Sequence, residues 1–136
     1  ALFDTPEAKP LIEKANKNIH FLGLKSNVGD YLRNSDAFVL SSHNEGMPIS
    51  LIEAMSCKCA LVSTPVSGCV DIIKDGVNGY ISKDFTEQEF IKAISRYISS
   101  YDKIDKENIY KYYVENLSIE KCAESYSSFF KECSKK

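Results

Sequence analysis

The stretch DAFVLSSHNEGMPISLIEAMSCKCALVS, residues 36–63, decides the fold of this chain. It opens with the apolar run AFVL at 37–40 and closes with the mainly apolar run ALVS at 60–63. Runs of this kind are typical of strands that are buried on both faces of a parallel sheet. Between them, apolar residues recur at helical spacing after Pro48, and proline favours the first position of a helix. The stretch therefore predicts a strand, a helix and a second, parallel strand joined by a right-handed crossover.

The same alternation continues towards the amino end. A weak helical period follows Pro6 within the first eighteen residues. The short run at 19–22 is rich in β-formers and is closed by Gly23, so it predicts another strand. Ser26-Asn27 then provides a start signal for a short helix that includes Val28 and Leu32.

Downstream, a brief helical patch at 70–73 leads to two strong turn signals, Asp75-Gly76 and Asn78-Gly79, and to a last short strand at 80–81. Helix, turn and strand thus follow the decisive stretch in the order that a parallel sheet requires.

Two longer helices are predicted in the remainder of the chain. The capping box formed by Thr86 and Glu89 begins a helix that is periodic as far as Tyr101. The mixed-charge run 102–107 is typical of a solvated connector. Ser118 can cap a final helix with a long apolar stripe, which predicts that this helix packs on another surface.

Strands that alternate with helices predict an α/β fold with an open, parallel, Rossmann-like sheet and helices on both faces. In such sheets, ligands bind at the carboxyl ends of the strands. The informative loops are therefore those that follow Leu22, Leu40 and Ser63.

Composition and charge exclude several classes of function. The chain has 136 residues and a formal net charge of −2, without the basic stripe of proteins that bind nucleic acid. No apolar run approaches the ~20 residues of a membrane-spanning helix, and no basic and apolar amino-terminal pattern predicts a signal peptide. The five cysteines lack C-x-x-C spacing, which favours free thiols in a reducing compartment over disulfides or structural zinc.

The helix that follows the loop at 41–47 offers an anion site at its amino end. Unpaired N–H groups and the positive end of the helix dipole favour a group such as a diphosphate there. Since Pro48 has no N–H, the expected donors are the amides of Ile49 and Ser50, with Leu51 as a third.

Two carboxylates flank these donors. Glu45 precedes the helix and Glu53 follows eight residues later, so the two are too far apart to share one proton. Each can instead accept two hydroxyl hydrogen bonds from a vicinal diol. From the residues alone, the alternative stays open that Glu45 only caps the loop and Glu53 is solvated. His43 lies two residues before Glu45 and could line the same cleft or be solvated.

Residues 45–55, EGMPISLIEAM, resemble the E-x7-E motif of the retaining glycosyltransferases of family 4, which have the GT-B fold. The resemblance covers roughly residues 19–100 as an ordered series of motifs. The run 19–23 is similar to the V-x-F-x-G strand of that family, and the stretches 37–42 and 76–79 also match. In this family, two Rossmann-like domains face each other across a cleft, and the carboxy-terminal one binds the nucleotide sugar.

The resemblance implies a role for each matching position. Glu45 would contact the donor sugar near the reacting carbon and is the candidate catalytic residue, and Glu53 would hold the ribose. The other implied substrate-binding residues lie along the loop and helix start, or against the base: Gly46, Met47, Ile49, Ser50, Leu24 and Lys25. Transfer would retain the anomeric configuration and need no metal or other cofactor. The sequence contains no D-x-D pair that would hold a divalent ion.

Some positions depart from the family pattern. Pro48 stands where many members have glycine, Lys58 and Ala60 replace a common glycine and proline, and Asp71 replaces a glutamate; these changes concern loop geometry. The resemblance further implies that residues 1–136 are a nucleotide-sugar-binding domain that is incomplete at its amino end. The basic pair that neutralises the diphosphate and the acceptor domain are both missing, so we expect negligible transferase activity from this chain alone.

The sequence therefore predicts the donor-binding part of a hexosyltransferase-type glycosyltransferase. It would use a nucleotide diphosphate sugar and a glycan or lipid-linked acceptor. We expect a bacterial, cytoplasmic enzyme of polysaccharide biosynthesis, compatible with peripheral attachment to the membrane and without a nucleic-acid partner. The alternative is a non-catalytic binding module with a Rossmann-like fold. A nicotinamide-binding domain is disfavoured because no G-x-G-x-x-G follows any predicted strand.

Overall fold

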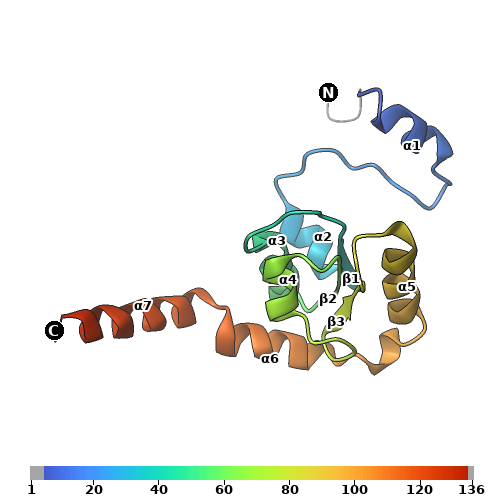
Figure 1. Cartoon of the computed structure of the whole chain (residues 1–136). Helices are drawn as coiled ribbons and strands as arrows, with labels where there is room; N and C mark the ends of the chain where they lie inside the picture. Colours follow the sequence, from blue (N-terminus) through green and yellow to red (C-terminus); the bar gives the residue numbers. More distant parts are fainter. Residues whose placement is uncertain (1–4, 135–136) are drawn as a thin grey trace.

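A parallel sheet lies at the centre of the computed structural model, which describes residues 5–134 (Figure 1). Within these residues, three strands pair in the order β1 (Ala37–Leu40), β2 (Ala60–Ser63) and β3 (Gly79–Ile81). The predicted open, parallel α/β sheet is confirmed. Of the domain predicted for residues 1–136, residues 1–4 and 135–136 lie outside the described part.

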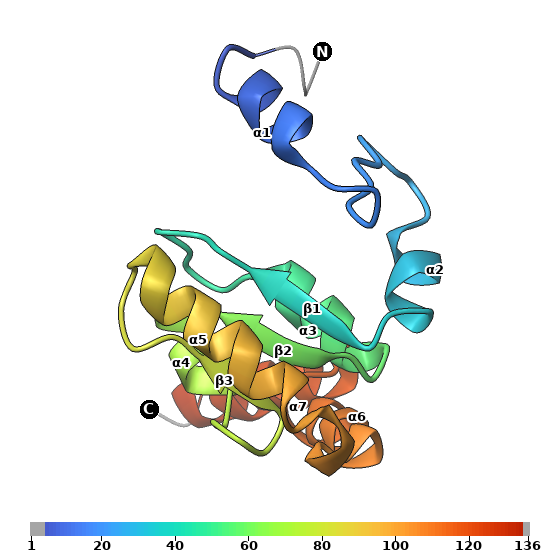
Figure 2. The same ribbon diagram turned by 90° about the vertical axis from the view of Figure 1, so that its right-hand side faces the viewer.

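Helices lie on both faces of this sheet (Figure 2). In chain order they are α1 (Ala8–Lys14), α2 (Val28–Arg33), α3 (Ile49–Ser56), α4 (Ser67–Ile72), α5 (Glu87–Ile98), α6 (Lys106–Asn116) and α7 (Ile119–Cys133), with a 3₁₀ turn η1 (Tyr101–Lys103) before α6. Helix α3 packs on β1 and β2, and α5 packs on β2 and β3. Figure 2 shows α5 in front of the sheet and α3 behind it, as predicted for a doubly covered sheet.

The hydrophobic core is centred on β2, whose four residues are all buried. Helix α3 adds Leu51, Ala54 and Met55, none of which is exposed to solvent. Complete burial of a side chain as large as Leu or Met stabilises the fold by roughly 1.5–3 kcal/mol. At Gly79 in β3, an added Cβ would overlap the carbonyl oxygen of Leu61 in β2. The close approach of these two strands therefore requires glycine.

The strand predicted at 19–22 does not form. This segment has no strand assignment, and Ile19, Phe21 and Leu22 are 43–52% exposed. A strand is stable only beside another strand that completes its backbone hydrogen bonds. Among the described residues, β1 is an edge strand that pairs with β2 alone. The prediction was therefore wrong for this chain although the local residues favour β-structure.

The run 102–107 is not simply a solvated connector. Ile104 within it is 6% exposed, and α6 begins at Lys106. The side chain of Asp105 caps α6 by accepting hydrogen bonds from the amides of Glu107 (2.9 Å) and Asn108 (3.4 Å). Sequence analysis missed α6, which packs against α3, although Asp105 was a recognisable cap.

The first and last helices extend away from this body (Figure 1). Thr86 and Ser118 cap α5 and α7 as predicted, because they accept hydrogen bonds from the amides of Glu89 and Lys121. The return bond of the predicted capping box does not form, since the amide of Thr86 donates to Asp84 instead of Glu89. Neither α1 nor α7 contains a buried residue. The apolar stripe of α7 thus has no partner surface among the described residues. In this part of the chain, no helix is both long and apolar enough to cross a membrane.

Candidate functional site

Two loops meet at the carboxyl edge of the sheet and form the candidate site. The loop 41–48 follows β1, and the loop 64–66 follows β2. The amide of Thr64 donates to the carbonyl of Leu40 (3.1 Å), and the hydroxyl of Thr64 donates to the carbonyl of Ser42. Because Thr64 is only 3% exposed, these two bonds hold the loop after β1 in a fixed position.

Glu45 is held partly buried within this loop. The hydroxyl of Ser42 donates to Oε1 of Glu45 at 2.7 Å, and among the described residues nothing binds Oε2. Burial raises the pKa of the nearby Cys69 thiol, and the negative charge of Glu45 adds to this effect, although a hydrogen bond from Ser63 opposes it. The Ser42 bond orients the carboxylate and leaves one oxygen for a ligand.

A second contact fixes the backbone around Gly46. A Cβ added to Gly68, in α4, would overlap the carbonyl oxygen of Gly46 and crowd Pro48. In contrast, a Cβ added to Gly46 would meet nothing within 4 Å. The loop is therefore packed tightly on the α4 side and open on the side of Gly46, where Met47 is 51% exposed.

The amino end of α3 differs in one respect from the sequence prediction. Pro48 is the residue before the helix, with φ −72° and ψ 103°, and no side chain caps the helix. The carbonyl of Pro48 accepts a hydrogen bond from the amide of Leu51 at 3.0 Å, so Leu51 is not available as a third donor. The amides of Ile49 and Ser50 have no acceptor in the described part of the chain. They are the groups that an anion would bind.

Glu53 lies one helical turn after Ile49, on the same side of α3. Its side chain is exposed and makes no hydrogen bond with other described residues. Exposure of this kind fits both interpretations of Glu53, as a ligand in an open cleft and as a solvated helix residue.

Leu24 and Lys25 are not brought to this site. They lie in the segment between α1 and α2, which Figures 1 and 2 draw apart from the sheet. Leu24 is 88% exposed. Since the predicted strand at 19–22 does not form, the loop that follows it has no fixed position at the sheet edge.

A groove of about 600 Å³ opens beside the two loops. Helix α1 contributes one apolar side chain to its lining, and the two loops and the start of α5 contribute the rest: Leu11, Ser41, His43, Thr64, Phe85, Thr86, Glu87 and Phe90. His43 stacks on Phe85 with ring centroids 5.5 Å apart and ring planes inclined by 23°. His43 was a candidate from the sequence, whereas Phe85 was not, although its position directly before the Thr86 cap was an available signal.

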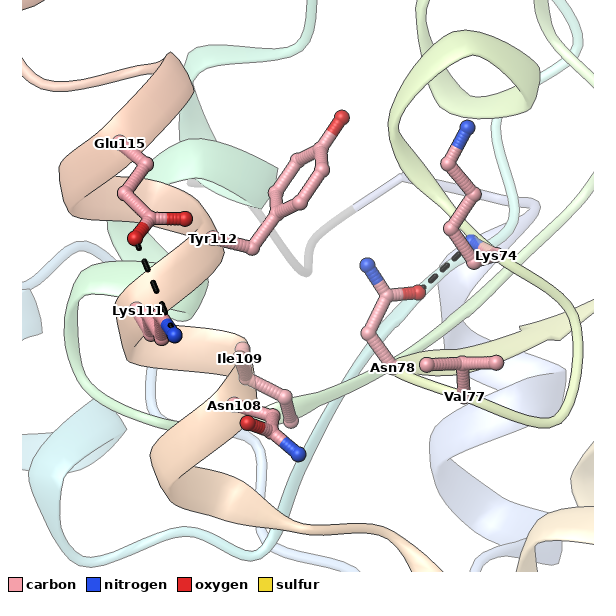
Figure 3. Close-up of a pocket in the computed structure, with 8 residues that line it drawn as sticks. All are labelled: Lys74, Val77, Asn78, Asn108, Ile109, Lys111, Tyr112 and Glu115. Atoms are coloured by element: carbon pink, nitrogen blue, oxygen red, sulfur yellow. Dashed lines mark hydrogen bonds and ion pairs between the residues drawn. The ribbon is translucent and has the colours of Figure 1, made fainter.

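A different cavity, of about 300 Å³, lies between α6 and the turn at 74–78 (Figure 3). Asn78 is buried there, but its side chain donates to the carbonyl of Ile72 and accepts from the amide of Lys74. Lys111 and Glu115 form an ion pair across one turn of α6. The side chain of Asn78 thus already has its hydrogen-bond partners. The turn that lines the cavity leads into the amino end of β3, so the cavity does not lie at the carboxyl edge of the sheet. Its side chains therefore stabilise the turn and do not form a binding site of the expected kind.

No cluster of three or more His, Cys, Asp or Glu side chains suited to a metal ion occurs within residues 5–134.

Residues 4–116 match the family described as "Glycosyl transferases group 1". The chain belongs to this family. A solved structure titled as the C-terminal domain of a glycosyl transferase group 1 family protein from Francisella tularensis has a TM-score of 0.65 at 25% identity, and the match covers 83% of this chain and 62% of that one. The fold is accordingly that of a GT-B carboxy-terminal domain.

Two curated relatives have comparable similarity to this group 1 glycosyltransferase chain. An N,N'-diacetylbacillosaminyl-diphospho-undecaprenol alpha-1,3-N-acetylgalactosaminyltransferase of Campylobacter jejuni is 36% identical over 77 residues, 57% of this chain. A probable sucrose-phosphate synthase of Thermosipho melanesiensis is 36% identical over 89 residues, 65% of this chain. The chain spans 20% of the length of each of these two relatives.

Proposed function

We propose that this chain is the nucleotide-sugar-binding, carboxy-terminal domain of a retaining glycosyltransferase of family 4. One observation supports this most directly. Among residues 5–134, nothing accepts a hydrogen bond from the amides of Ile49 and Ser50 at the carboxyl edge of the sheet, and this helix end has no acidic residue in its first turn. Glu45 and Glu53 flank them. This arrangement suits a ligand with a diphosphate in the middle and hydroxyl groups at both ends.

Each group has a distinct role in the proposal. The two amides and the dipole of α3, equivalent to about half a positive charge, bind the diphosphate. Glu45, oriented by Ser42, accepts from hydroxyls of the donor sugar near the reacting carbon. Gly46 and Met47 lie along the sugar, since the side of Gly46 is open. Glu53 binds the ribose hydroxyls.

In the proposed reaction, the bond between the anomeric carbon and the diphosphate oxygen breaks, and a bond to the oxygen of an acceptor hydroxyl forms with retention of configuration. The proton of that hydroxyl passes to the departing diphosphate. Negative charge develops on the diphosphate as it leaves, and the amino end of α3 stabilises it. The proposal requires neither a metal nor another cofactor. Leu24 and Lys25 would approach the base once the segment before α2 is placed against the sheet.

The names of the relatives favour a particular class of acceptor and a particular cellular location. The name of the Campylobacter jejuni relative specifies an undecaprenol-linked acceptor and an N-acetylhexosamine. We accordingly propose hexosyl transfer to a glycan or lipid-linked acceptor in polysaccharide biosynthesis, in the bacterial cytoplasm at the membrane surface. Because this chain spans a fifth of that relative, the acceptor is proposed to bind elsewhere in a longer protein, and the chain alone should show negligible turnover.

Calorimetric titration with UDP-, GDP- and ADP-sugars tests the donor site. We expect one of these nucleotide sugars to bind, and Glu45→Gln and Glu53→Gln each to weaken it roughly 10- to 100-fold, because each removes charge-assisted hydrogen bonds. Glu132→Gln is the matched control, since Glu132 is an exposed acid on α7, far along the chain from the site.

Unchanged binding in both variants would show that the carboxylates do not hold the donor. The interpretation as a non-catalytic binding module would then be correct. A transferase assay with the same nucleotide sugars and a saccharide acceptor completes the test, and clear turnover by this chain would contradict the proposed division of labour between domains.

A further inference from the structure

The groove beside Glu45 contains an exposed aromatic pair that the donor site does not use. We infer that this groove binds the ring of an uncharged sugar, with Phe85 and His43 as the stacking surface. The inference rests on the proposed function and extends it. In that function the carboxylates and helix amides contact hydroxyls and phosphates, whereas the groove provides an aromatic surface for the face of a sugar ring.

The aromatic pair is suited to this ligand by its exposure and geometry. Phe85 is 43% exposed although its ring already stacks on His43 at 5.5 Å. The stack orients both rings without covering them. A pyranose ring has C–H groups on its faces and hydroxyls around its edge, so it packs on an aromatic surface and hydrogen-bonds at its rim. The volume of about 600 Å³ is within the range of small-molecule sites.

The charges of the groove exclude a phosphate. Among the described residues that line it, none is Lys or Arg, and Glu87 is acidic. The adjoining amino end of α5 is also closed to anions, because Thr86 caps the amide of Glu89 and two acids occupy the first turn. The uncapped end of α3 has the opposite character. A diphosphate therefore belongs at α3, and a neutral, hydroxyl-bearing group belongs in the groove.

Polar groups are available for those hydroxyls. The hydroxyl of Ser41 and the carboxylate of Glu87 line the groove and have no hydrogen-bond partner within residues 5–134. Thr64, also in the lining, donates to the carbonyl of Ser42, and the hydroxyl of Ser42 donates to Glu45. These contacts link the groove wall to the proposed catalytic carboxylate. Figure 2 shows the loop after β1 and the start of α5 side by side at this edge of the sheet.

Two sugars could supply the ring, namely the sugar of the donor and a sugar of the acceptor. NMR of the chain labelled with ¹³C in its Phe and His rings and ¹⁵N in its amides can separate them. The probes are UDP, GDP and ADP, their sugars, and the methyl glycosides of glucose, galactose, N-acetylglucosamine and N-acetylgalactosamine at tens of millimolar. We expect at least one methyl glycoside or nucleotide sugar to shift the Phe85 and His43 signals, and the matching nucleoside diphosphate alone to shift only the amides of Ile49 and Ser50. A response to a methyl glycoside that persists when the nucleotide sugar is bound indicates the acceptor sugar, and a response that the nucleotide sugar gives itself or abolishes indicates the donor sugar.

Variants at the platform test the stacking itself. Phe85→Ala should weaken saccharide binding roughly tenfold, whereas Phe85→Tyr should retain it because the ring face remains. Phe129→Ala, which removes an aromatic residue that is also exposed but lies on α7, is the control and should change nothing.

Other results would overturn the inference in recognisable ways. If the amides of Ile49 and Ser50 respond to a nucleotide sugar while Phe85 and His43 respond to no sugar, the inference fails and the proposed donor site stands. If a nucleoside diphosphate alone shifts the aromatic signals, the groove stacks a base and not a sugar. If the aromatic rings respond to saccharides but the α3 amides respond to no nucleotide, the groove binds sugars and the proposed function fails.

Discussion

At the scale of single residues, two glycines next to the candidate site have opposite requirements. Gly68 faces the carbonyl oxygen of Gly46, and no Cβ fits between them. Gly46 faces open space, so the fold itself does not require glycine at that position. If glycine is required there, the reason lies in a ligand that approaches the backbone closely.

Alanine at each position separates these two requirements. Gly68→Ala should lower the free energy of unfolding by roughly 1–3 kcal/mol, because the new methyl group must displace the loop backbone at 46–48. Gly46→Ala should leave stability within about 0.5 kcal/mol and weaken nucleotide-sugar binding. Urea denaturation and calorimetric titration of both variants make the comparison. Full binding by a stable Gly46→Ala protein would mean that no ligand approaches at this side of the loop.

The cysteines differ in reactivity for a similar local reason. Cys59 and Cys69 are fully buried, and burial raises the pKa of both thiols above the ordinary value of 9.0. Cys122 and Cys133 are exposed. Thiolate is the reactive form, so iodoacetamide at pH 8 should modify Cys122 and Cys133 rapidly, and Cys59 and Cys69 only after unfolding.

The same shift has a consequence at alkaline pH. Unfolding returns both buried thiols to their ordinary pKa and therefore releases protons above about pH 9. The stability that these two groups contribute is complete below that pH and declines as the pH rises towards their pKa values in the folded protein.

The iodoacetamide prediction is checked by mass spectrometry of the labelled protein with and without urea, which measures the order in which the cysteines are modified. Equal labelling of all five cysteines in the native state would contradict the predicted order.

At the scale of the elements, helices and central strands could be predicted because each has a local signal. The runs at β1 and β2 are apolar throughout or nearly so, and the side chains of Thr86 and Ser118 cap their helices as expected. The missed α6 shows the limit of this approach. Its sequence mixes tyrosines with charged residues, so it has no clear apolar period. The helix on which it packs, α3, lies much earlier in the chain, and this contact cannot be read from the local sequence.

The caps of α6 and α7 should contribute unequally to stability. Asp105→Ala removes two hydrogen bonds at the start of α6, a helix that buries Ile109 and packs on α3. We expect a loss of about 1 kcal/mol in the free energy of unfolding. Ser118→Ala removes the cap of α7, which contains no buried residue, so its loss should scarcely change global unfolding.

Urea denaturation followed by far-ultraviolet circular dichroism distinguishes these outcomes. Ser118→Ala should lower the native helical signal through fraying of α7 without moving the midpoint. An equal shift of the midpoint in both variants would mean that α7 folds together with the core.

At the scale of the whole molecule, local signals no longer decide the outcome. The run at 19–22 has the residues of a strand, but in the described part of the chain the sheet begins at β1 and this run does not join it. The predicted position of Leu24 and Lys25 at the sheet edge depends on that strand, so the structure does not place these two residues at the site. Glu45, Ile49 and Ser50 lie at the carboxyl edge of the sheet, as the sequence pattern indicated, because one strand–loop–helix unit positions all three. Their roles in binding stay predictions.

The molecule is thus a small core with two helices that contribute nothing to it, and its stability should be distributed accordingly. Amide hydrogen exchange is slow only where exchange requires global unfolding. We expect the greatest protection in β2, with its four buried residues, and in the buried positions of α3. Amides in α1, in the segment 15–27 and in α7 should exchange orders of magnitude faster, because opening these parts exposes almost no new apolar surface.

Hydrogen exchange followed by mass spectrometry at two protein concentrations tests this distribution of protection. Protection of α7 that persists on dilution would contradict the prediction, whereas protection that disappears on dilution would show that a second copy covers the stripe with Phe129 and Phe130, which are about 60% exposed in the single chain.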